Sequence, residues 1–243
     1  MKILKNTNVL KIAINEVSNL GFVPTMGGLH KGHFSLIKKS QQKCKKTLVS
    51  IYVNPKQFNN KRDFFNYPRN IDKDLSLLKK VNVDFVFIPN TKNLYTFKKQ
   101  KKFSILKKEQ ILCAKKRKGH FEGVLKVMDK FISLLNPRYI FMGEKDFQQL
   151  HLVKKFIEKK YKSKIISCKT IRNKNNLPLS SRNDLLSKEN QYKAGLVSTA
   201  LKIFKKNIKN KNFTNNQLLF FRNKLTKKFN IKIEYLEVRN EQN

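Results

Sequence analysis

The 243-residue chain has little of several residue types that define whole classes of protein. It contains no Trp and only 3 Cys, and Cys44, Cys113 and Cys168 lie far apart without metal-ligand spacing. This excludes a disulfide-stapled scaffold and a cysteine metal site, and it favours a reducing compartment. No run approaches the ~20 apolar residues that span a bilayer, and residues 1–10 lack the apolar core of a secretory signal. We therefore expect a cytoplasmic protein without a membrane segment.

Acidic residues are also scarce, because 16 Asp and Glu stand against 54 Lys and Arg, which gives a formal net charge of +38. Such a field attracts polyanions, and the attraction weakens with added salt. The lysines are spread along the whole chain and are not gathered between stacking aromatic residues, as a nucleic-acid surface requires. We expect nucleic-acid binding to be nonspecific at most, and the charge to reflect compositional drift.

Short apolar segments alternate with helical segments over the first two thirds of the chain. The predicted strands are 20–23, 47–53, 84–88, 138–142 and 164–170, and the predicted helices are 9–20, 34–44, 72–81, 124–135 and 146–161. This alternation predicts an α/β fold with a Rossmann-like, doubly wound parallel sheet. Ligands of such sheets bind outside the carboxyl ends of the strands.

The pattern changes after residue 170. A loop over 171–182 precedes predicted helices over 188–207 and 214–229 and a last alternating strand over 231–238. We therefore expect a Rossmann-like domain over 1–172 and a smaller C-terminal α+β domain over 173–243.

Two of the 4 histidines fall in one short stretch that follows the first predicted strand, which is Met26-Gly27-Gly28-Leu29-His30-Lys31-Gly32-His33. We expect Pro24 and Thr25 to form the turn that leaves this strand. A glycine-rich turn between a strand and a helix exposes backbone N–H groups at the positive end of the helix dipole, which is a phosphate site. A plain connecting loop is the alternative, since short motifs match by chance.

Three further segments carry candidate site residues. Asn54 and Gln57 follow the strand 47–53, and their amides suit hydroxyl and carboxylate oxygens, although ordinary turn residues look the same. Lys145 lies near a helix amino end, where a cation is unfavourable unless an anion binds beside it. A loop with two hydroxyls and a guanidinium, Leu179-Ser180-Ser181-Arg182, is suited to close over phosphates.

These segments supply cations, hydroxyls and backbone donors, without a Gly-x-Ser-x-Gly elbow or a Gly-Lys-Ser/Thr phosphate loop. Groups of this kind stabilise the charge of a transferring phosphoryl group, so nucleotidyl transfer is the reaction type that we expect. A nucleotidyltransferase acting on another acid or alcohol and a basic nucleic-acid-binding protein are the alternatives.

The order and spacing of these motifs resemble the pantothenate synthetase (pantoate–β-alanine ligase) family over nearly the entire chain. The resemblance is carried by Pro24-Thr25-Met26-Gly27-Gly28-Leu29-His30-Lys31-Gly32-His33, Val53-Asn54-Pro55-Lys56-Gln57-Phe58, Gly119-His120-Phe121-Glu122-Gly123-Val124, Gly143-Glu144-Lys145-Asp146-Phe147-Gln148-Gln149-Leu150 and Leu179-Ser180-Ser181-Arg182-Asn183. The His-x-Gly-His core alone would indicate only the wider nucleotidyltransferase superfamily, which includes class I aminoacyl-tRNA synthetases.

The resemblance implies a homodimeric enzyme that condenses (R)-pantoate with β-alanine through a pantoyl adenylate, using ATP and Mg²⁺ and releasing AMP and diphosphate. It implies catalytic roles for His30, His33, Lys145 and Arg182, and binding of pantoate by Gln57 and Gln149 and of β-alanine by Gln57. We add Asn54 to the substrate-binding set. The residues implied to bind ATP are Met26, Gly27, Gly28, Leu29, His30, Lys31, Gly32, His33, Gly143, Glu144, Lys145, Asp146, Ile171, Leu179, Ser180, Ser181 and Arg182.

The sequence departs from the family pattern in three places. Lys118 and Glu122 stand where Pro and Arg are common, which we interpret as tolerated variation. Lys73 interrupts the acidic stretch between Asp72 and Asp74, so we assign no Mg²⁺ ligand. The chain ends soon after Arg239, where family members continue, so we expect a shortened C-terminal lid domain with an exposed sheet edge.

Overall fold

The computed structural model describes residues 1–95, 103–208 and 213–239. The chain divides into two compact units. Unit 1 comprises Met1–Ile171 and Leu179–Arg182, and unit 2 comprises Arg172–Pro178 and Asn183–Asn243. That residues 1–172 and 173–243 form separate domains stays a prediction. The two units of the structure are not divided at a single position, because Leu179–Arg182 belongs to unit 1.

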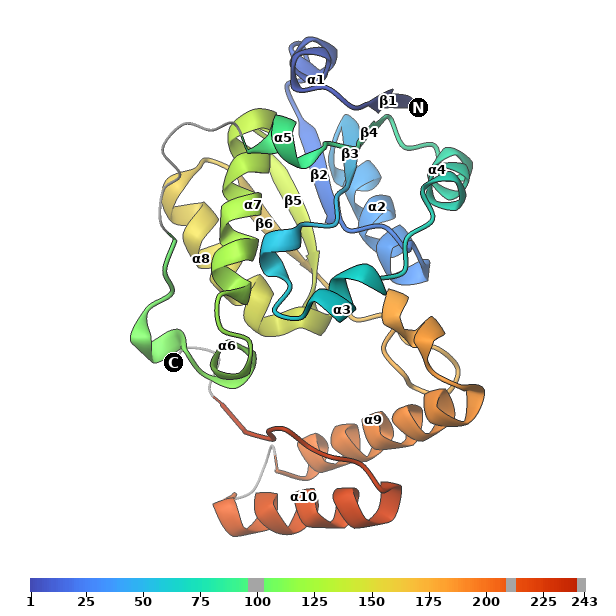
Figure 1. The fold of residues 1–243 in the computed structure, drawn as a ribbon, viewed down its shortest axis with the longest axis vertical. Helices are drawn as coiled ribbons and strands as arrows, with labels where there is room; N and C mark the ends of the chain where they lie inside the picture. The colour runs from blue at the N-terminus through green and yellow to red at the C-terminus, as the bar shows by residue number, and fades with distance from the viewer. Residues whose placement is uncertain (96–102, 209–212, 240–243) are drawn as a thin grey trace. The chain divides into compact units, whose positions relative to one another are not determined.

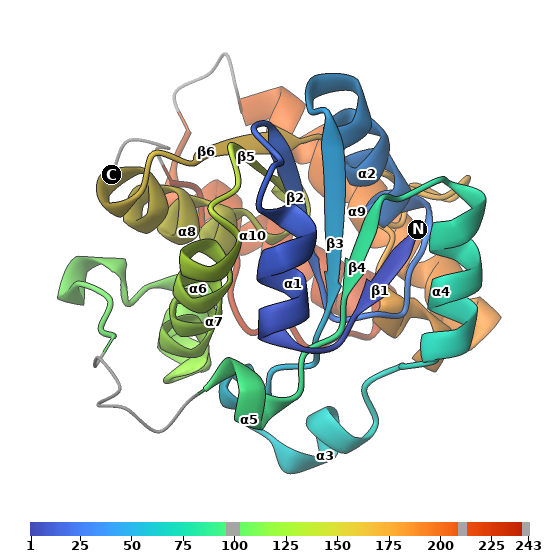
Figure 2. The same ribbon diagram turned by 90° about the horizontal axis from the view of Figure 1, so that it is seen from above.

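Unit 1 is built on a six-stranded sheet with the order β1-β4-β3-β2-β5-β6, in which the paired strands are parallel (Figures 1 and 2). The α/β prediction is therefore confirmed. The strands are β1 (Lys2–Leu4), β2 (Leu20–Thr25), β3 (Lys46–Ile51), β4 (Phe85–Phe87), β5 (Tyr139–Gly143) and β6 (Lys164–Cys168). The order runs from β2 through β3 to β4 in one direction and from β5 to β6 in the other. The topological switch point, where such sheets bind ligands, therefore lies between β2 and β5.

Helices cover both faces of this sheet. Figure 2 shows α1, α7 and α8 on one face and α2 and α4 on the other. The helices of unit 1 are α1 (Thr7–Ile14), α2 (Lys31–Lys43), α3 (Lys61–Phe65), α4 (Ile71–Lys80), α5 (Thr91–Leu94), α6 (Leu112–Lys116), α7 (His120–Leu135) and α8 (Phe147–Lys160). Short 3₁₀ turns are η1 (Pro55–Gln57), η2 (Lys107–Glu109), η3 (Glu144–Asp146) and η4 (Ser181–Leu185).

Consecutive residues of a central strand pack into two different cores, one on each face of the sheet. Phe22 packs with the α1, α7 and α8 side, whereas Val23 packs with Leu36 and Ile37 of α2 and Leu78 of α4. Leu48 and Val49 of β3 divide in the same way. Because side chains alternate across a strand, a sheet that is covered on both faces has continuous apolar strands. This is why the sequence shows short apolar runs in place of polar–apolar alternation.

Three local predictions are wrong. Pro24 and Thr25 belong to β2 and not to a turn, and Pro24 is tolerated there because the pairing of β2 with β5 covers only Gly21 and Phe22. The helix expected over 9–20 ends at Ile14. Residues 231–239, which the structure describes, form no strand; instead the Arg222 side chain donates to the Ile233 carbonyl. Alternation alone does not make a strand when no neighbouring edge pairs with it. Strand β1 was not predicted, because its three residues are too few to show a period.

Unit 2 contains the two predicted C-terminal helices, α9 (Lys188–Ile208) and α10 (Asn215–Phe229). Phe204 of α9 stacks on Phe221 of α10 with ring centroids 4.0 Å apart. Thr214 caps α10 through a reciprocal hydrogen-bond pair with Gln217. In the parts of the chain that the structure describes, no helix is long and apolar enough to cross a membrane.

We predict that Gly123→Ala destabilises unit 1. A Cβ at Gly123 of α7 would lie 2.2 Å from the Lys56 carbonyl oxygen and 3.0 Å from Gln57 Cα. The clash is with backbone and should cost about 1–3 kcal/mol, which exceeds the gain of up to about 1 kcal/mol in helix propensity. Urea unfolding of the variant measures the net effect. Gly143→Ala is the matched control, since nothing lies within 4 Å of its added Cβ. A Gly123→Ala variant as stable as the unsubstituted protein would contradict the prediction.

Candidate functional site

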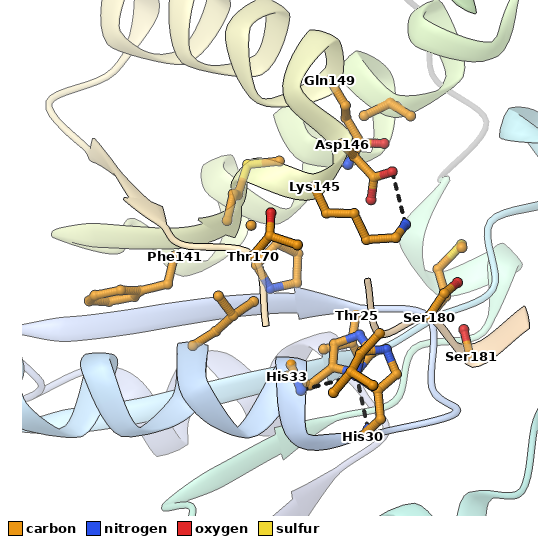
Figure 3. A pocket seen from close by; sticks show the side chains of 18 of the residues that line it. Thr25, His30, His33, Phe141, Lys145, Asp146, Gln149, Thr170, Ser180 and Ser181 are labelled. Carbon is orange, nitrogen blue, oxygen red and sulfur yellow. Dashed lines mark hydrogen bonds and ion pairs between the residues drawn. The ribbon is translucent and has the colours of Figure 1, made fainter. Parts of the chain in front are cut away.

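A cavity of about 250 Å³ opens in unit 1 at the carboxyl ends of β2, β5 and β6. Its wall includes Thr25 at the end of β2, Gly143 at the end of β5, and Thr170 just after β6. The cavity therefore lies at the switch point of the sheet. Figure 3 shows His30 and His33 on one side and Lys145, Asp146 and Gln149 on the other.

The glycine turn differs from the open phosphate cradle that we expected. The carboxylate of Asp74, in the first turn of α4, accepts hydrogen bonds from the backbone N–H of Gly28 (2.9 Å) and of Leu29 (2.8 Å). Asp74 is buried, with 2% of its surface exposed. An anion of the protein itself therefore occupies the N–H groups that the sequence analysis assigned to a phosphate. Gly28, at φ +63°, permits this turn, and a Cβ there would lie 2.8 Å from Ser181 Cβ.

The two histidines cap α2. The N–H of Gly32 donates to Nδ1 of His30 (3.1 Å), and the N–H of His30 donates to Nδ1 of His33 (3.3 Å). The rings lie close together, with centroids 4.1 Å apart. Because each Nδ1 accepts a hydrogen bond from a backbone N–H, a neutral ring carries its proton on Nε2. The capping contacts therefore fix two Nε2–H donors.

The charge state of His33 decides what this side chain can offer to a phosphate. Burial, together with the smaller electrostatic effects of His30 and Lys145, lowers the pKa of His33 to about 3. His33 is thus neutral at pH 7 in the ligand-free protein. It can donate a hydrogen bond from Nε2, but it contributes no full positive charge.

The opposite wall comes from η3 and the start of α8. Lys145 forms an ion pair with Asp146 (3.3 Å), and both residues line the cavity together with Gln149. The neighbouring carboxylate compensates the lysine at this helix start, so Lys145 does not require a bound anion for its stability. Its side chain remains partly exposed, with an exposed fraction of 36%.

Gln57 lines the cavity and is held in place from behind. Its Nε2 donates to the sulfur of Met26 (2.8 Å), while the amide of Asn54 donates to its Oε1 (3.3 Å). His120 contacts the Gln57 carbonyl through Nδ1 (2.6 Å), and burial lowers the pKa of His120. Asn54 itself is buried and also donates to the Gly123 carbonyl (3.1 Å). The structure therefore places Asn54 behind Gln57 and not on the cavity wall, where we expected it.

The wall is completed by Leu179–Arg182, which the structure assigns to unit 1. The hydroxyl of Ser181 lies 3.0 Å from the hydroxyl of Tyr67. Arg182 donates from Nε (3.1 Å) and Nη2 (3.0 Å) to the two carboxylate oxygens of Asp63. Its positive charge is thus also paired with a carboxylate.

Most of the predicted site residues line one cavity. The residues brought together are Met26, His30, Gly32, His33, Gln57, Gly143, Lys145, Asp146, Gln149, Ile171, Leu179, Ser180, Ser181 and Arg182. The remaining predicted residues, which are Gly27, Gly28, Leu29, Lys31, Asn54 and Glu144, are not on its wall. Glu144 instead accepts a hydrogen bond from the Ser167 hydroxyl (2.7 Å).

An apolar wall, a cation and two acids of the site were not predicted from the sequence. Val124, Val127, Met128 and Phe131 of α7 line the cavity at helical spacing, which the sequence alone does not distinguish from ordinary core. Lys169 and Thr170 follow β6, and only the rule that ligands bind at strand ends would have singled them out. Asp63 and Asp74 act through pairs 119 and 46 residues apart, for which the sequence carries no signal.

No group of three or more His, Cys, Asp and Glu side chains placed to hold a metal ion occurs in the described residues. Near the cavity, Asp63 is bound to Arg182, Asp74 to the glycine turn and Asp146 to Lys145. The protein side chains therefore do not fit a preformed cage for Mg²⁺, which prefers several unengaged oxygen ligands.

Comparisons with known proteins agree with this geometry. Residues 2–243 match the family model described as pantoate-beta-alanine ligase. The pantothenate synthetase of Clostridium botulinum (strain ATCC 19397 / Type A) is 40% identical over 233 residues, which cover 95% of this chain and 83% of the relative. The pantothenate synthetase of Flavobacterium psychrophilum is 40% identical over 208 residues, which cover 83% of this chain and 74% of the relative.

Solved structures give the same result. The pantoate-beta-alanine ligase from Francisella tularensis, complexed with beta-gamma ATP and beta-alanine, superposes with a TM-score of 0.87 at 35% identity and covers 99% of this chain and 90% of its own. The pantothenate synthetase from Thermus thermophilus has a TM-score of 0.86 at 28% identity, with 94% of this chain and 83% of its own covered. With the matched motifs gathered in one cavity, the chain belongs to the pantoate-beta-alanine ligase family.

Proposed function

We propose that this protein condenses pantoate with β-alanine at the expense of ATP, through a pantoyl adenylate, and releases AMP and diphosphate. The observation that carries the proposal is the convergence of the His30/His33 pair, Gln57, Gln149 and Lys145 on one cavity at the switch point. Each of these residues lies in a motif of the family to which the chain belongs. The Francisella tularensis relative, whose structure contains beta-gamma ATP and beta-alanine, supports the same assignment.

The cavity suits the two halves of this chemistry. Val124, Val127 and Met128 form an apolar surface for the branched carbon skeleton of pantoate. Gln57 and Gln149 offer amide groups for its hydroxyl and carboxylate oxygens. The wall formed by His30, His33 and Lys145 offers donors to the phosphates of ATP, and β-alanine would share the Gln57 side.

In the first step a pantoate carboxylate oxygen attacks the α-phosphorus, an acyl–O–P bond forms, and the bond from that phosphorus to diphosphate breaks. The carboxylate is already ionised at pH 7, since carboxyl pKa values lie near ~4, so no base is needed. The barrier comes from the charge that grows on the leaving diphosphate. Hydrogen-bond donors fixed in advance lower such a barrier by about 3–4 kcal/mol each.

His33 supplies such a donor as a neutral imidazole. Its Nδ1 accepts the His30 N–H and its pKa lies near 3, so the neutral ring presents Nε2–H at physiological pH. A neutral donor strengthens its hydrogen bond as the phosphate oxygen gains charge, and it does not form a tight ion pair with the substrate beforehand. Lys145 and Arg182 supply the full positive charges.

In the second step the β-alanine amine, after losing a proton, attacks the acyl carbon of the adenylate. The C–N bond forms, the C–O bond to AMP breaks, AMP leaves with the electron pair, and the nitrogen releases a second proton to solvent as the amide forms. The adenylate must be kept from water until then, which gives a purpose to coverage of the cavity by Leu179–Arg182.

Mg²⁺ would be held mainly by the nucleotide phosphates, because the carboxylates near the cavity are engaged with Arg182, Lys145 and the glycine turn. When bound, it would neutralise phosphate charge. A homodimer and a lid role for residues 173–243 complete the proposal and rest on the family resemblance. A cytoplasmic location is also part of it and rests on the three cysteines, which are few and lie far apart in the sequence.

The proposal predicts diphosphate release from ATP and pantoate in the absence of β-alanine. At moderate salt, where nonspecific attraction to the positive surface is screened, release should require pantoate, and β-alanine should be needed only for pantothenate. His33→Ala should slow release about 100-fold or more, while its circular dichroism spectrum stays unchanged. Absence of release from the unsubstituted protein would contradict the proposed function, and release at an unchanged rate from His33→Ala would contradict the role of His33.

The low pKa of His33 predicts a pH dependence of stability. Between pH 6.5 and pH 3 the unfolded chain binds a proton at this residue and the folded protein does not. The free energy of unfolding therefore falls as the pH decreases through this window and is fully retained above pH 6.5. Urea unfolding at pH 7 and pH 5 should show a smaller acid loss for His33→Gln than for the unsubstituted protein. His151→Gln, at an exposed histidine off the cavity wall, is the control and should keep the full loss. Equal losses in all three proteins would show that His33 is not held neutral.

A further inference from the structure

Arg182 is held from two directions inside unit 1. The side-on pair with Asp63 uses the Nε and Nη2 edge of the guanidinium, with both bonds close to ideal length, at 3.1 Å and 3.0 Å. The Tyr67 ring faces the same guanidinium, whose Cζ lies 4.9 Å from the ring centroid. A bidentate pair combined with a cation–π contact fixes both the position and the plane of the group.

Tyr67 is itself well fixed. It is buried, its ring packs edge-on against Phe58 with centroids 5.8 Å apart, and its hydroxyl is bonded to Ser181. Burial raises the pKa of Tyr67, so the ring stays a neutral phenol at physiological pH. Tyr67 therefore orders two consecutive residues of the cavity wall, Ser181 and Arg182.

Asp63 pairs with Arg182 although other cations lie nearer to it in the sequence. It lies in the first turn of α3, directly after Lys61 and Arg62, yet it binds a residue 119 positions away. The side chains of the pair are 40% and 37% exposed, and ion pairs exposed to this degree contribute little to folding stability. The ion pair therefore acts mainly by orienting Arg182 and contributes little to the stability of the fold.

We infer that Asp63 is a positioning residue, which holds Arg182 so that its remaining amino group, Nη1, serves the nucleotide phosphates. The pair with Asp63 leaves both N–H bonds of Nη1 to point elsewhere, and Arg182 lines the cavity. Asp63 itself is not on the cavity wall. The inference rests on the proposed function for the identity of the ligand, and it adds Asp63 and Tyr67 to the residues that prepare the site.

The alternative physical reading is that Asp63 competes with the phosphates. In that case the pair would have to break before Arg182 could bind the nucleotide, and removal of the carboxylate would strengthen binding. The two readings predict opposite signs for the same substitution, so one equilibrium measurement separates them.

The test is calorimetric binding of ATP in the absence of pantoate and β-alanine. Asp63→Asn is nearly isosteric and removes the charge, and it should weaken ATP binding about 10-fold or more, since a lost charge-assisted hydrogen bond costs about that factor. Asp63→Glu keeps the charge and should recover part of the affinity. Arg182→Gln should weaken binding at least as much as Asp63→Asn.

The double variant Asp63→Asn/Arg182→Gln decides whether Asp63 acts through Arg182. If it does, the double variant binds ATP as weakly as Arg182→Gln alone, because the effects of coupled residues are not additive. Asp84→Asn is the matched control. It weakens the pair with Lys46 at the amino ends of β3 and β4, where the half-buried Asp84 also accepts the Thr47 N–H. Asp84 is off the cavity wall, so the substitution should leave ATP affinity unchanged.

Additive losses in the double variant, or unchanged or tighter ATP binding by Asp63→Asn, would overturn the inference. The measurement is independent of the condensation reaction. If the unsubstituted protein binds ATP but releases no diphosphate with pantoate, the proposed function fails while the role of Asp63 is still decided by the binding series.

Discussion

The hydrogen bonds between the buried carboxylate of Asp74 and the amides of Gly28 and Leu29 are the contact on which the site depends. They hold the chain in the tight turn between β2 and α2, and this turn places His30 at the N-cap and His33 in the first turn of the helix. An unpaired carboxylate or two unpaired amides at this depth would be costly, so the arrangement is held as a unit. This contact therefore determines where His30 and His33 lie.

Several carboxylates bind the residues that form the cavity, although the protein is strongly basic. Of only 16 acidic residues in the chain, Asp63, Asp74 and Asp146 engage elements of one cavity. Asp63 and Asp146 pair with the two cations that would meet phosphates, and these pairs reduce the repulsion between like charges before a nucleotide binds. The cavity is therefore less a cluster of free positive charge than a set of oriented donors. Preorganised donors of this kind need little rearrangement when charge develops.

The sequence predicted what is local and periodic. Apolar runs such as 20–23 and helical spacing such as 124–135 gave the α/β alternation, and the rule for strand ends placed Gln57 and Lys145 at one edge of the sheet. Gln149 was implied by the family resemblance. It did not predict the partners of Asp74 and Asp63, because a contact 46 or 119 residues away leaves no pattern in the chain. It also wrongly gave a strand to 231–238, because alternation does not reveal whether a sheet edge is there to pair with. Asn54 shows a third limit, since an amide behind a cavity and an amide on its wall have the same sequence signature.

The most direct measurement of the central claim is a crystal structure of this protein with bound ATP. The account predicts that Asp74 keeps its hydrogen bonds to the amides of Gly28 and Leu29, and that the phosphates lie at the Nε2 atoms of His30 and His33 and at the Lys145 ammonium group. A structure in which a phosphate oxygen displaces the Asp74 carboxylate from those amides, with the imidazoles turned away, would contradict it.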